Sequence, residues 1–323
     1  MKTTILTATC LFLALVLAGT AWADEVWVGS DGDSTITVID SATQKVVTTI
    51  SVPRTPHNIT FSPDGAVAFA TAHAGDTVTM IDAGTKKVVG SLPAGALPNK
   101  VGVTPDGSEL WTGSLGPKNI TVVNLKTKEK AATLKAGTTP IYFVFSPDGK
   151  RAYVTNWDSN DVSVIDTASR KVLASIPVPK HPIDLRLLPD GRLVVASGLK
   201  GDVGDHAVSI IDPATNKVVG TIDKKWQDPR YLVLHPDGKR LFVASRGSNT
   251  IAVVDVATMK ILKEFPGAKN TGLIGLTADG KLLYGVDRDA PAAVAIDPES
   301  GKVVATVPVG KKPFGLAVRP AGR

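Results

Sequence analysis

One stretch of the chain decides the fold: Ser146–Asn156, which reads SPDGKRAYVTN. Its Pro-Asp-Gly segment is a tight-turn signal, because proline presets φ and glycine accepts a positive φ. The residues that follow, Ala152–Thr155, include the aromatic and β-branched side chains that favour a strand. The stretch therefore predicts a turn that leads into a short β-strand.

This unit recurs along the chain at a nearly constant spacing. Its glycine lies at positions 65, 107, 149, 191, 238, 280 and 322, so successive copies are 42, 42, 42, 47, 42 and 42 residues apart. A period of this length is typical of propellers and solenoids. A second marker is an Asp or Asn three residues before a Thr or Ser, whose side chain can accept hydrogen bonds from the turn it opens. It occurs in every copy, at positions 40, 82, 124, 166, 212, 255 and 297.

Short alternating or β-branched runs lie between these markers, so each repeat predicts four antiparallel strands. The two ends of the chain are out of phase with the repeat. Val26–Val28 is a second strand without a first, and Phe314–Val318 is a first strand without a second. Because the last strand can complete the first sheet, we predict an all-β propeller of seven four-stranded blades over residues 24–323, closed into a ring.

Tyr153-Val154-Thr155-Asn156 is the signature that names the YVTN β-propeller repeat family, and the mature chain resembles that family's repeat throughout. The resemblance implies the propeller fold. It says little of function, because propellers host binding proteins, lactonases, lyases and redox partners. Many members are exported bacterial or archaeal proteins of unassigned role, and the resemblance implies the same for this chain.

The first residues, Met1–Ala23, are typical of a signal peptide. Lys2 supplies the positive start, Leu11–Leu17 the apolar run and Ala21–Ala23 the small-residue cleavage pattern. No later stretch approaches the roughly 20 apolar residues of a spanning helix. We therefore expect cleavage after Ala23 and a soluble, monomeric, periplasmic or secreted product.

Cysteine and charge exclude several classes of function. The only cysteine is Cys10, so the mature chain could form no disulfide, thiolate metal site or cysteine nucleophile. The formal net charge of +6 falls to +5 when Lys2 is removed with the leader. No basic patch with interleaved aromatics is evident, so we expect no nucleic-acid binding.

The connections between blades differ most among the copies, and those on one face would surround the mouth of the central channel. A residue that is unusual in one copy is free to serve a ligand, whereas a repeated residue serves the blade. The predicted rim for a ligand or partner is Arg54, His57, Asn58, Asn99, Lys100, Tyr142, Trp157, His181, Asp184, Arg230, Tyr231, Arg246, Lys269, Arg288 and Lys312. This polar, basic rim suits a small polar or anionic ligand or a partner's acidic loop, although any propeller mouth needs polar side chains to meet water.

Three further features have two readings each. Four histidines map to this face, but none has the His-x-His or His-x-x-x-His spacing of a metal site, so we predict neither a metal nor a cofactor. If a metal were bound, His57 and His181 would be the ligand pair. The insertion Gly198–Asp205 is either a contact loop or a tolerated surface insertion. Trp157 and Trp226 are either exposed anchors for a partner or residues packed on a neighbouring blade.

Three functions remain open. The first is a non-catalytic scaffold that binds a protein or a small ligand at the channel mouth. The second is a lactonase-like hydrolase or lyase with His57, His181 or Asp184 in acid/base roles, although no nucleophile elbow, metalloprotease motif or nucleotide fingerprint appears. The third is an accessory to a periplasmic redox enzyme, without a Cys-x-x-Cys-His haem attachment site of its own.

Overall fold

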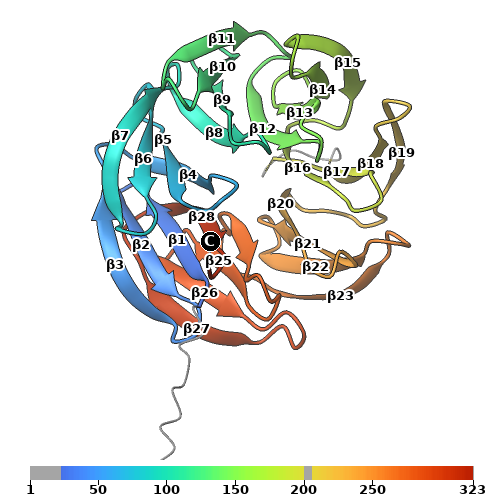
Figure 1. Cartoon of the computed structure of the whole chain (residues 1–323). Helices are drawn as coiled ribbons and strands as arrows, with labels where there is room; N and C mark the ends of the chain where they lie inside the picture. The colour runs from blue at the N-terminus through green and yellow to red at the C-terminus, as the bar shows by residue number, and fades with distance from the viewer. Residues whose placement is uncertain (1–22, 200–205, 323) are drawn as a thin grey trace, which may run out of the picture.

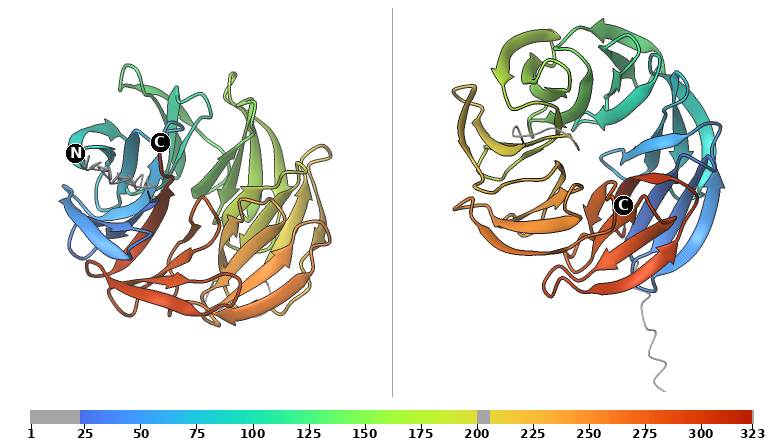
Figure 2. Two further views of the ribbon diagram at one scale, coloured as in Figure 1. Left: turned by 60° about the horizontal axis from the view of Figure 1, so that its bottom comes forward. Right: turned by 180° about the vertical axis from the view of Figure 1, so that it is seen from behind.

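Seven four-stranded antiparallel sheets surround a central channel in the computed structural model, which describes residues 23–199 and 206–322 (Figure 1). Each sheet is one blade, and its innermost strand lines the channel. The strands run between the two faces of the ring, so the connections gather on those faces (Figure 2). The predicted fold is confirmed.

Within each blade, the strands follow one another from the channel outward. Blade 1 contains β28 (Pro313–Arg319), β1 (Glu25–Ser30), β2 (Thr35–Asp40) and β3 (Lys45–Ser51). Blades 2 and 3 contain β4 (Pro56–Phe61), β5 (Val67–Ala72), β6 (Thr77–Asp82) and β7 (Lys87–Pro93), then β8 (Pro98–Val103), β9 (Glu109–Ser114), β10 (Asn119–Asn124) and β11 (Lys130–Leu134). Blades 4 and 5 contain β12 (Pro140–Phe145), β13 (Arg151–Asn156), β14 (Asp161–Asp166) and β15 (Lys171–Pro177), then β16 (Pro182–Leu187), β17 (Leu193–Ser197), β18 (Ala207–Asp212) and β19 (Lys217–Thr221). Blades 6 and 7 contain β20 (Pro229–Leu234), β21 (Arg240–Ser245), β22 (Thr250–Asp255) and β23 (Ile261–Pro266), then β24 (Ile274–Leu276), β25 (Leu283–Asp287), β26 (Ala292–Ile296) and β27 (Val303–Pro308).

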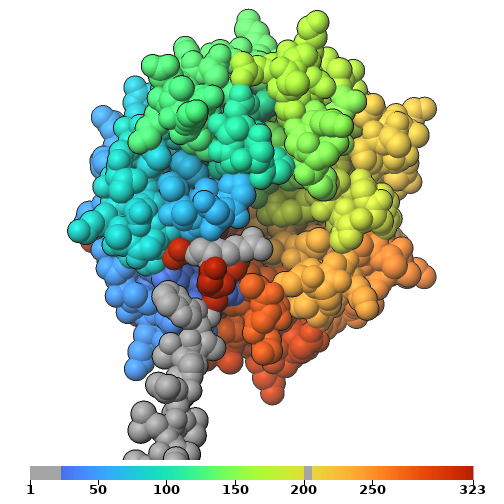
Figure 3. Space-filling model, viewed as in Figure 1, coloured from blue at the N-terminus to red at the C-terminus, as the bar shows by residue number. Residues whose placement is uncertain are grey.

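The ring closes through the two ends of the chain. Strand β28 pairs with β1, with Val318 opposite Val26 and Leu316 opposite Val28. The inner strands contact one another in sequence around the whole ring, and the last contact, between β28 and β4, joins blade 1 to blade 2. The centre of the ring is recessed on the face that Figure 3 shows. Closure brings the starts of all seven inner strands around one opening.

The repeated turn residues act as predicted. The Asp166 carboxylate accepts hydrogen bonds from the backbone N of Ser169 at 2.8 Å and from its hydroxyl at 2.7 Å. Gly149 has φ of 70° and donates its N–H to the carbonyl of Ser146 at 2.8 Å. Equivalent bonds recur in other blades, so both markers are structural.

Apolar side chains from facing sheets fill the space between blades. Trp27 and Trp111, on the second strands of blades 1 and 3, are completely buried. Trp226 is 5% exposed and donates its indole N–H to the carbonyl of Ile222 at 3.1 Å. The hypothesis of an exposed anchor is therefore wrong for Trp226, because the ring packs in the core between blades 5 and 6.

Two predicted segments fall outside the described residues: the leader up to residue 22, and positions 200–205 of the predicted insertion. Over residues 23–199 and 206–322, no helix has the length and apolar character needed to cross a bilayer.

Candidate functional site

The starts of the inner strands form the site. Six of them begin at a proline, and the residue before it has a positive φ in five copies: Leu97, Thr139, His181, Asp228 and Lys312. The two residues after each proline begin the inner strand at this end of the channel. Those residues are His57 and Asn58, Asn99 and Lys100, Ile141 and Tyr142, Ile183 and Asp184, Arg230 and Tyr231, and Phe314 and Gly315.

A pocket of about 420 Å³ lies at this mouth. Inner strands of six blades contribute to its wall, and three loops complete it. Its lining residues are His57, Asn99, Lys100, Leu115, Lys118, Thr139, Ile141, Trp157, Asp158, Ile183, Arg230, Tyr231 and Phe314. The pocket therefore combines apolar and aromatic walls with a few basic groups, as small-molecule sites commonly do.

Lys100 is the most unusual residue of the pocket. It is 3% exposed, and its Nζ has no hydrogen-bond partner among the described residues. The Nζ lies 5.3 Å from the ring centroid of Tyr142, 5.5 Å from that of Tyr231 and 5.9 Å from that of Phe314. Burial lowers the pKa of Lys100 to about 7; Asp184 opposes this shift, and Arg186 and Arg230 add to it.

Asp184 and the partly buried Arg186 form an ion pair near Lys100. Both side chains lie on the same face of β16 because they are two residues apart. Asp184 is completely buried; it accepts from Arg186 Nη1 at 2.5 Å and from the backbone N of Leu232 at 2.9 Å. Burial raises its pKa, whereas Arg186 and the Leu232 amide act against this rise. The guanidinium also lies over the Tyr142 ring, 4.8 Å from its centroid.

A second buried aspartate orients Arg230. Asp228 accepts from Arg230 Nε at 3.0 Å and from Arg246 Nε at 2.7 Å, and it is 1% exposed. The Arg230 guanidinium lies 5.3 Å from the ring centroid of Trp157, which also contacts the His181 ring in a tilted arrangement, with centroids 4.8 Å apart. Arg230 is thus fixed against the aromatic wall of the pocket.

Phe314 organises the opposite wall. The His57 ring stacks on Phe314 with centroids 3.8 Å apart, and on His73 with centroids 4.4 Å apart. Burial lowers the pKa of His57 to about 4, although the bond of its Nδ1 to Asp31 at 3.2 Å acts in the other direction. Arg288 lies over the outer side of this cluster, 4.7 Å from the Phe314 centroid.

The site has a surplus of positive charge. Asp184 is ion-paired with Arg186, and Asp228 is ion-paired with both Arg230 and Arg246. Lys118 pairs with Asp158 at 3.1 Å, whereas neither Lys100 nor Arg288 forms an ion pair with a described residue. An anion that enters the pocket would therefore meet a favourable potential in a partly desolvated space.

The structure brings some of the predicted rim residues together and separates others. The pocket is lined by His57, Asn99, Lys100, Trp157, Arg230 and Tyr231, while Tyr142 and Asp184 lie near Lys100 without lining it. By contrast, the predicted rim residues Arg54, Lys269 and Lys312 are exposed side chains that do not line it, and Asn58 is buried, accepting a bond from the backbone N of Val101.

Arg186 was missed by the sequence interpretation. It sits at the fourth position after its proline, where the other blades carry Thr60, Gly102, Val144, Val233, Gly275 and Ala317. The alternation of a strand from Asp184 to Arg186 was the signal that could have found it.

His57, His181 and Asp184, the predicted acid/base residues, have separate partners. His57 bonds to Asp31 and Asp184 to Arg186, while the His181 ring contacts that of Trp157. In the part of the chain that the structure describes, no three His, Cys, Asp or Glu side chains are grouped closely enough to hold a metal.

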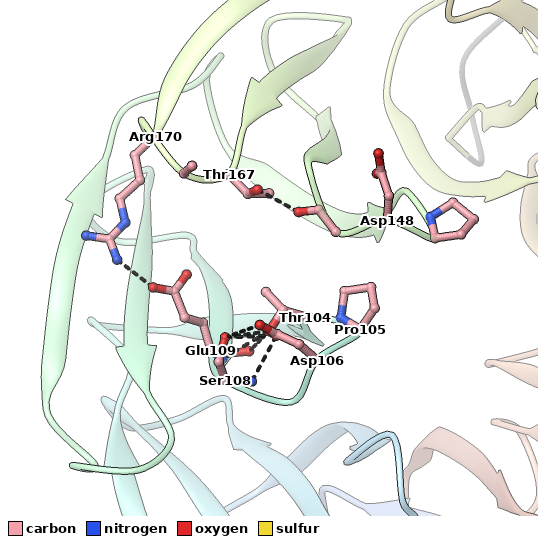
Figure 4. A pocket seen from close by; sticks show the side chains of 11 residues that line it. Thr104, Pro105, Asp106, Ser108, Glu109, Asp148, Thr167 and Arg170 are labelled. Carbon is pink, nitrogen blue, oxygen red and sulfur yellow. Dashed lines mark hydrogen bonds and ion pairs between the residues drawn. The ribbon is translucent and has the colours of Figure 1, made fainter.

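Another pocket, of about 500 Å³, lies between the Pro-Asp-Gly turns of blades 3 and 4 (Figure 4). Its polar groups bond to each other: Arg170 pairs with Glu109 at 2.5 Å, and Asp106 accepts from Thr104 and Ser108. Glu109 also accepts from the indole N–H of Trp111 at 3.0 Å. The same Glu–Trp–base arrangement recurs two blades earlier, at Glu25, Trp27 and Lys86, so it serves the blade.

Comparisons with known proteins agree with this architecture. The model of the YNCE-like beta-propeller family matches residues 3–320. No relative was found among curated proteins.

Three solved structures are similar over most of the chain. Hydrazine synthase from Kuenenia stuttgartiensis has a TM-score of 0.72 and 26% identity, over 80% of this chain and 88% of that one. A functionally unknown protein from Desulfotomaculum acetoxidans has a TM-score of 0.80 and 16% identity, over 93% and 100%. Dihydro-heme d1 dehydrogenase NirN, in complex with DHE, has a TM-score of 0.67 and 21% identity, over 91% and 74%. The last two likenesses show the fold alone.

Proposed function

The chain belongs to the YNCE-like beta-propeller family, and on this scaffold we propose that the channel mouth binds a small organic anion without catalysis, in an exported protein. The observation that carries the proposal is Lys100: a buried amine without a hydrogen-bond partner among the described residues, in a pocket that also contains Arg230. A carboxylate is the chemical group that would accept hydrogen bonds from both Lys100 and Arg230.

The walls of the pocket restrict the rest of the ligand. Trp157, Tyr231 and Phe314 present rings, and Ile141 and Ile183 present aliphatic surface. A planar or aromatic body would bury apolar area against these side chains while its carboxylate meets the basic groups. We therefore assign an aromatic carboxylate as the simplest ligand class.

Calorimetric titration with three matched probes tests this assignment. Benzoate should bind, whereas benzamide and benzylammonium should bind at least about tenfold more weakly, because a charge-assisted hydrogen bond contributes about 1.5–3 kcal/mol. Arg230→Gln should weaken benzoate binding by a similar factor. Arg170→Gln, at the opposite end of the blades and also ion-paired, is the matched control and should leave it unchanged. Equal binding of the three probes would overturn the proposal.

A second candidate function is that of an accessory or component of a periplasmic redox enzyme. The likeness to hydrazine synthase, at 26% identity over 88% of that chain, favours it. Affinity capture from the native periplasm, followed by mass spectrometry, tests this function. A redox enzyme recovered with the wild type, and lost with rim variants such as Trp157→Ala, would support it; recovery of none would count against it.

A further inference from the structure

We propose that Lys100 captures its ligand covalently, by condensing its ε-amine with the ketone or aldehyde carbonyl of a carboxylate-bearing ligand. This inference rests on the proposed function, because the anion pocket must first hold the ligand. It adds a chemical class, the 2-oxo acids, to the aromatic carboxylates inferred above.

The repeat shows that Lys100 does not make the hydrogen bond between blades that two other copies make at its position. In blade 2 the equivalent residue, Asn58, accepts a hydrogen bond from the Val101 amide of the next inner strand. In blade 5 Asp184 accepts in the same way from the Leu232 amide. An amine has no carbonyl or carboxylate oxygen with which to make this bond, and no other copy carries a basic residue at this position. Lys100 therefore makes no such bond between blades, and its amine instead contacts the rings of Tyr142, Tyr231 and Phe314.

The surroundings of the amine favour nucleophilic chemistry. Burial lowers the pKa of Lys100 to about 7, so a large fraction of the amine is neutral at neutral pH and its lone pair is available. The side chain lines the pocket, and its amine lies among aromatic rings.

Lys86 shows what a structural lysine looks like in the same protein. Its Nζ also lies over an aromatic ring, 5.4 Å from the Trp27 centroid. However, it is paired with the Glu25 carboxylate at 2.7 Å and also donates to the Ala83 carbonyl. Lys100 has the aromatic neighbours without such a pair among the described residues.

The proposed step balances without an oxidant or reductant. The neutral amine of Lys100 attacks the carbonyl carbon, the C–N bond forms, and a proton moves from nitrogen to the former carbonyl oxygen. Protonation of this hydroxyl lets it leave as water, and the product is a protonated Schiff base. Arg230 would hold the adjacent carboxylate of the ligand, and the iminium charge would remain beside it.

Reductive trapping tests the proposal. The wild-type protein is incubated with benzoylformate and sodium cyanoborohydride, then analysed by intact mass and peptide mapping. Mandelate, which carries a hydroxyl in place of the ketone, is the matched ligand. We expect one reduced adduct at Lys100 with benzoylformate and none with mandelate. Lys100→Arg and Lys100→Met should both abolish it, while Lys86→Arg retains it; circular dichroism establishes that each variant is folded.

Calorimetry in the absence of reductant distinguishes failure of the covalent step from failure of anion binding. If benzoylformate and mandelate bind equally and no adduct forms at Lys100, the covalent step is overturned and the anion site stands. An adduct distributed over many lysines, unchanged in Lys100→Arg, also overturns the covalent step. If neither ligand binds, the proposed function fails together with it.

Discussion

Lys100 shows how far a single residue can depart from the repeat that surrounds it. The repeat supplies the same backbone position in every blade, but the side chain there is Asn58, Lys100, Tyr142, Asp184, Tyr231, Leu273 or Gly315. Because blade packing does not require any one of these side chains, the position can take on residues that are unfavourable for stability. A buried lysine is such a residue.

Replacing Lys100 by methionine should therefore stabilise the protein. Below pH 7 the amine is charged in both the folded and the unfolded state, and its burial costs stability. Replacing a buried ion pair by apolar side chains of similar volume often gains about 1–4 kcal/mol, and removing this unpaired charge should gain an amount of the same order. Between pH 7 and 10.5 the unfolded state binds more protons, so wild-type stability rises with pH and the gain in Lys100→Met shrinks. Urea denaturation across this pH range checks the prediction, which a gain independent of pH would contradict.

His57 should give the protein an acid-sensitive component of stability. Its folded pKa of about 4 lies below its ordinary value of 6.5, so the unfolded state binds more protons between these values. Stability should fall by roughly 3.5 kcal/mol as the pH drops through this window, at about 1.4 kcal/mol per pKa unit. In His57→Gln, which keeps an N–H donor toward Asp31, this component should be missing. Equal acid sensitivity of the two proteins would show that His57 is not the source.

At the scale of the strand, close approach between blades constrains single positions. Gly113 lies near the end of β9, where an added Cβ would be 2.2 Å from the carbonyl oxygen of Pro140 on β12. Gly29 faces Pro56 in the same way between blades 1 and 2, with 2.5 Å for the equivalent distance. Glycine at these positions lets the mouth of the channel close tightly.

Gly113→Ala should consequently destabilise the protein by about 1–3 kcal/mol, because strand β12 must move to admit the methyl group. Gly220→Ala is the matched control: it also lies in a strand, β19, but its added Cβ would meet nothing nearer than Ile210 Cδ1 at 3.7 Å. Thermal unfolding of the two variants should show a clear loss only for Gly113→Ala. A loss of the same size in both would contradict the close approach.

The strands were predictable because their signals are local. The Pro-Asp-Gly turn and the Asx marker act over three to five residues, and both recur in the chain often enough to define the blade boundaries. The same register predicted a set of rim residues, of which His57, Asn99, Lys100, Trp157, Arg230 and Tyr231 line the pocket and Arg54, Lys269 and Lys312 do not. The convergence of Lys100, Tyr142, Tyr231 and Phe314 did not, because these residues come from four blades and their distances depend on the closed ring. The ion pair between Asp184 and Arg186 also became visible only in the structure.

At the scale of the whole molecule, the pocket depends on closure of the ring. Phe314, which stacks on His57 and lies near Lys100, belongs to β28, the strand that closes blade 1. The C-terminal strand therefore both closes the ring and contributes a wall of the pocket.

Truncation after Lys312 should destabilise the protein severely, since it removes the inner strand of blade 1 and the apolar side chains of Phe314 and Leu316. A milder truncation, after Arg319, retains β28 and serves as the control. Melting temperatures should fall strongly for the first and slightly for the second. A protein ending at Lys312 that melts like the full chain would contradict closure by β28.

The most direct test of the central claim is a crystal structure of the protein soaked with benzoate. We predict the carboxylate within hydrogen-bond distance of Lys100 Nζ or the Arg230 guanidinium, with the ring of benzoate against Trp157 or Phe314. Benzoate ordered elsewhere on the ring, with an empty pocket and Lys100 hydrogen-bonded to the Asp184 carboxylate, would contradict an anion site at the channel mouth.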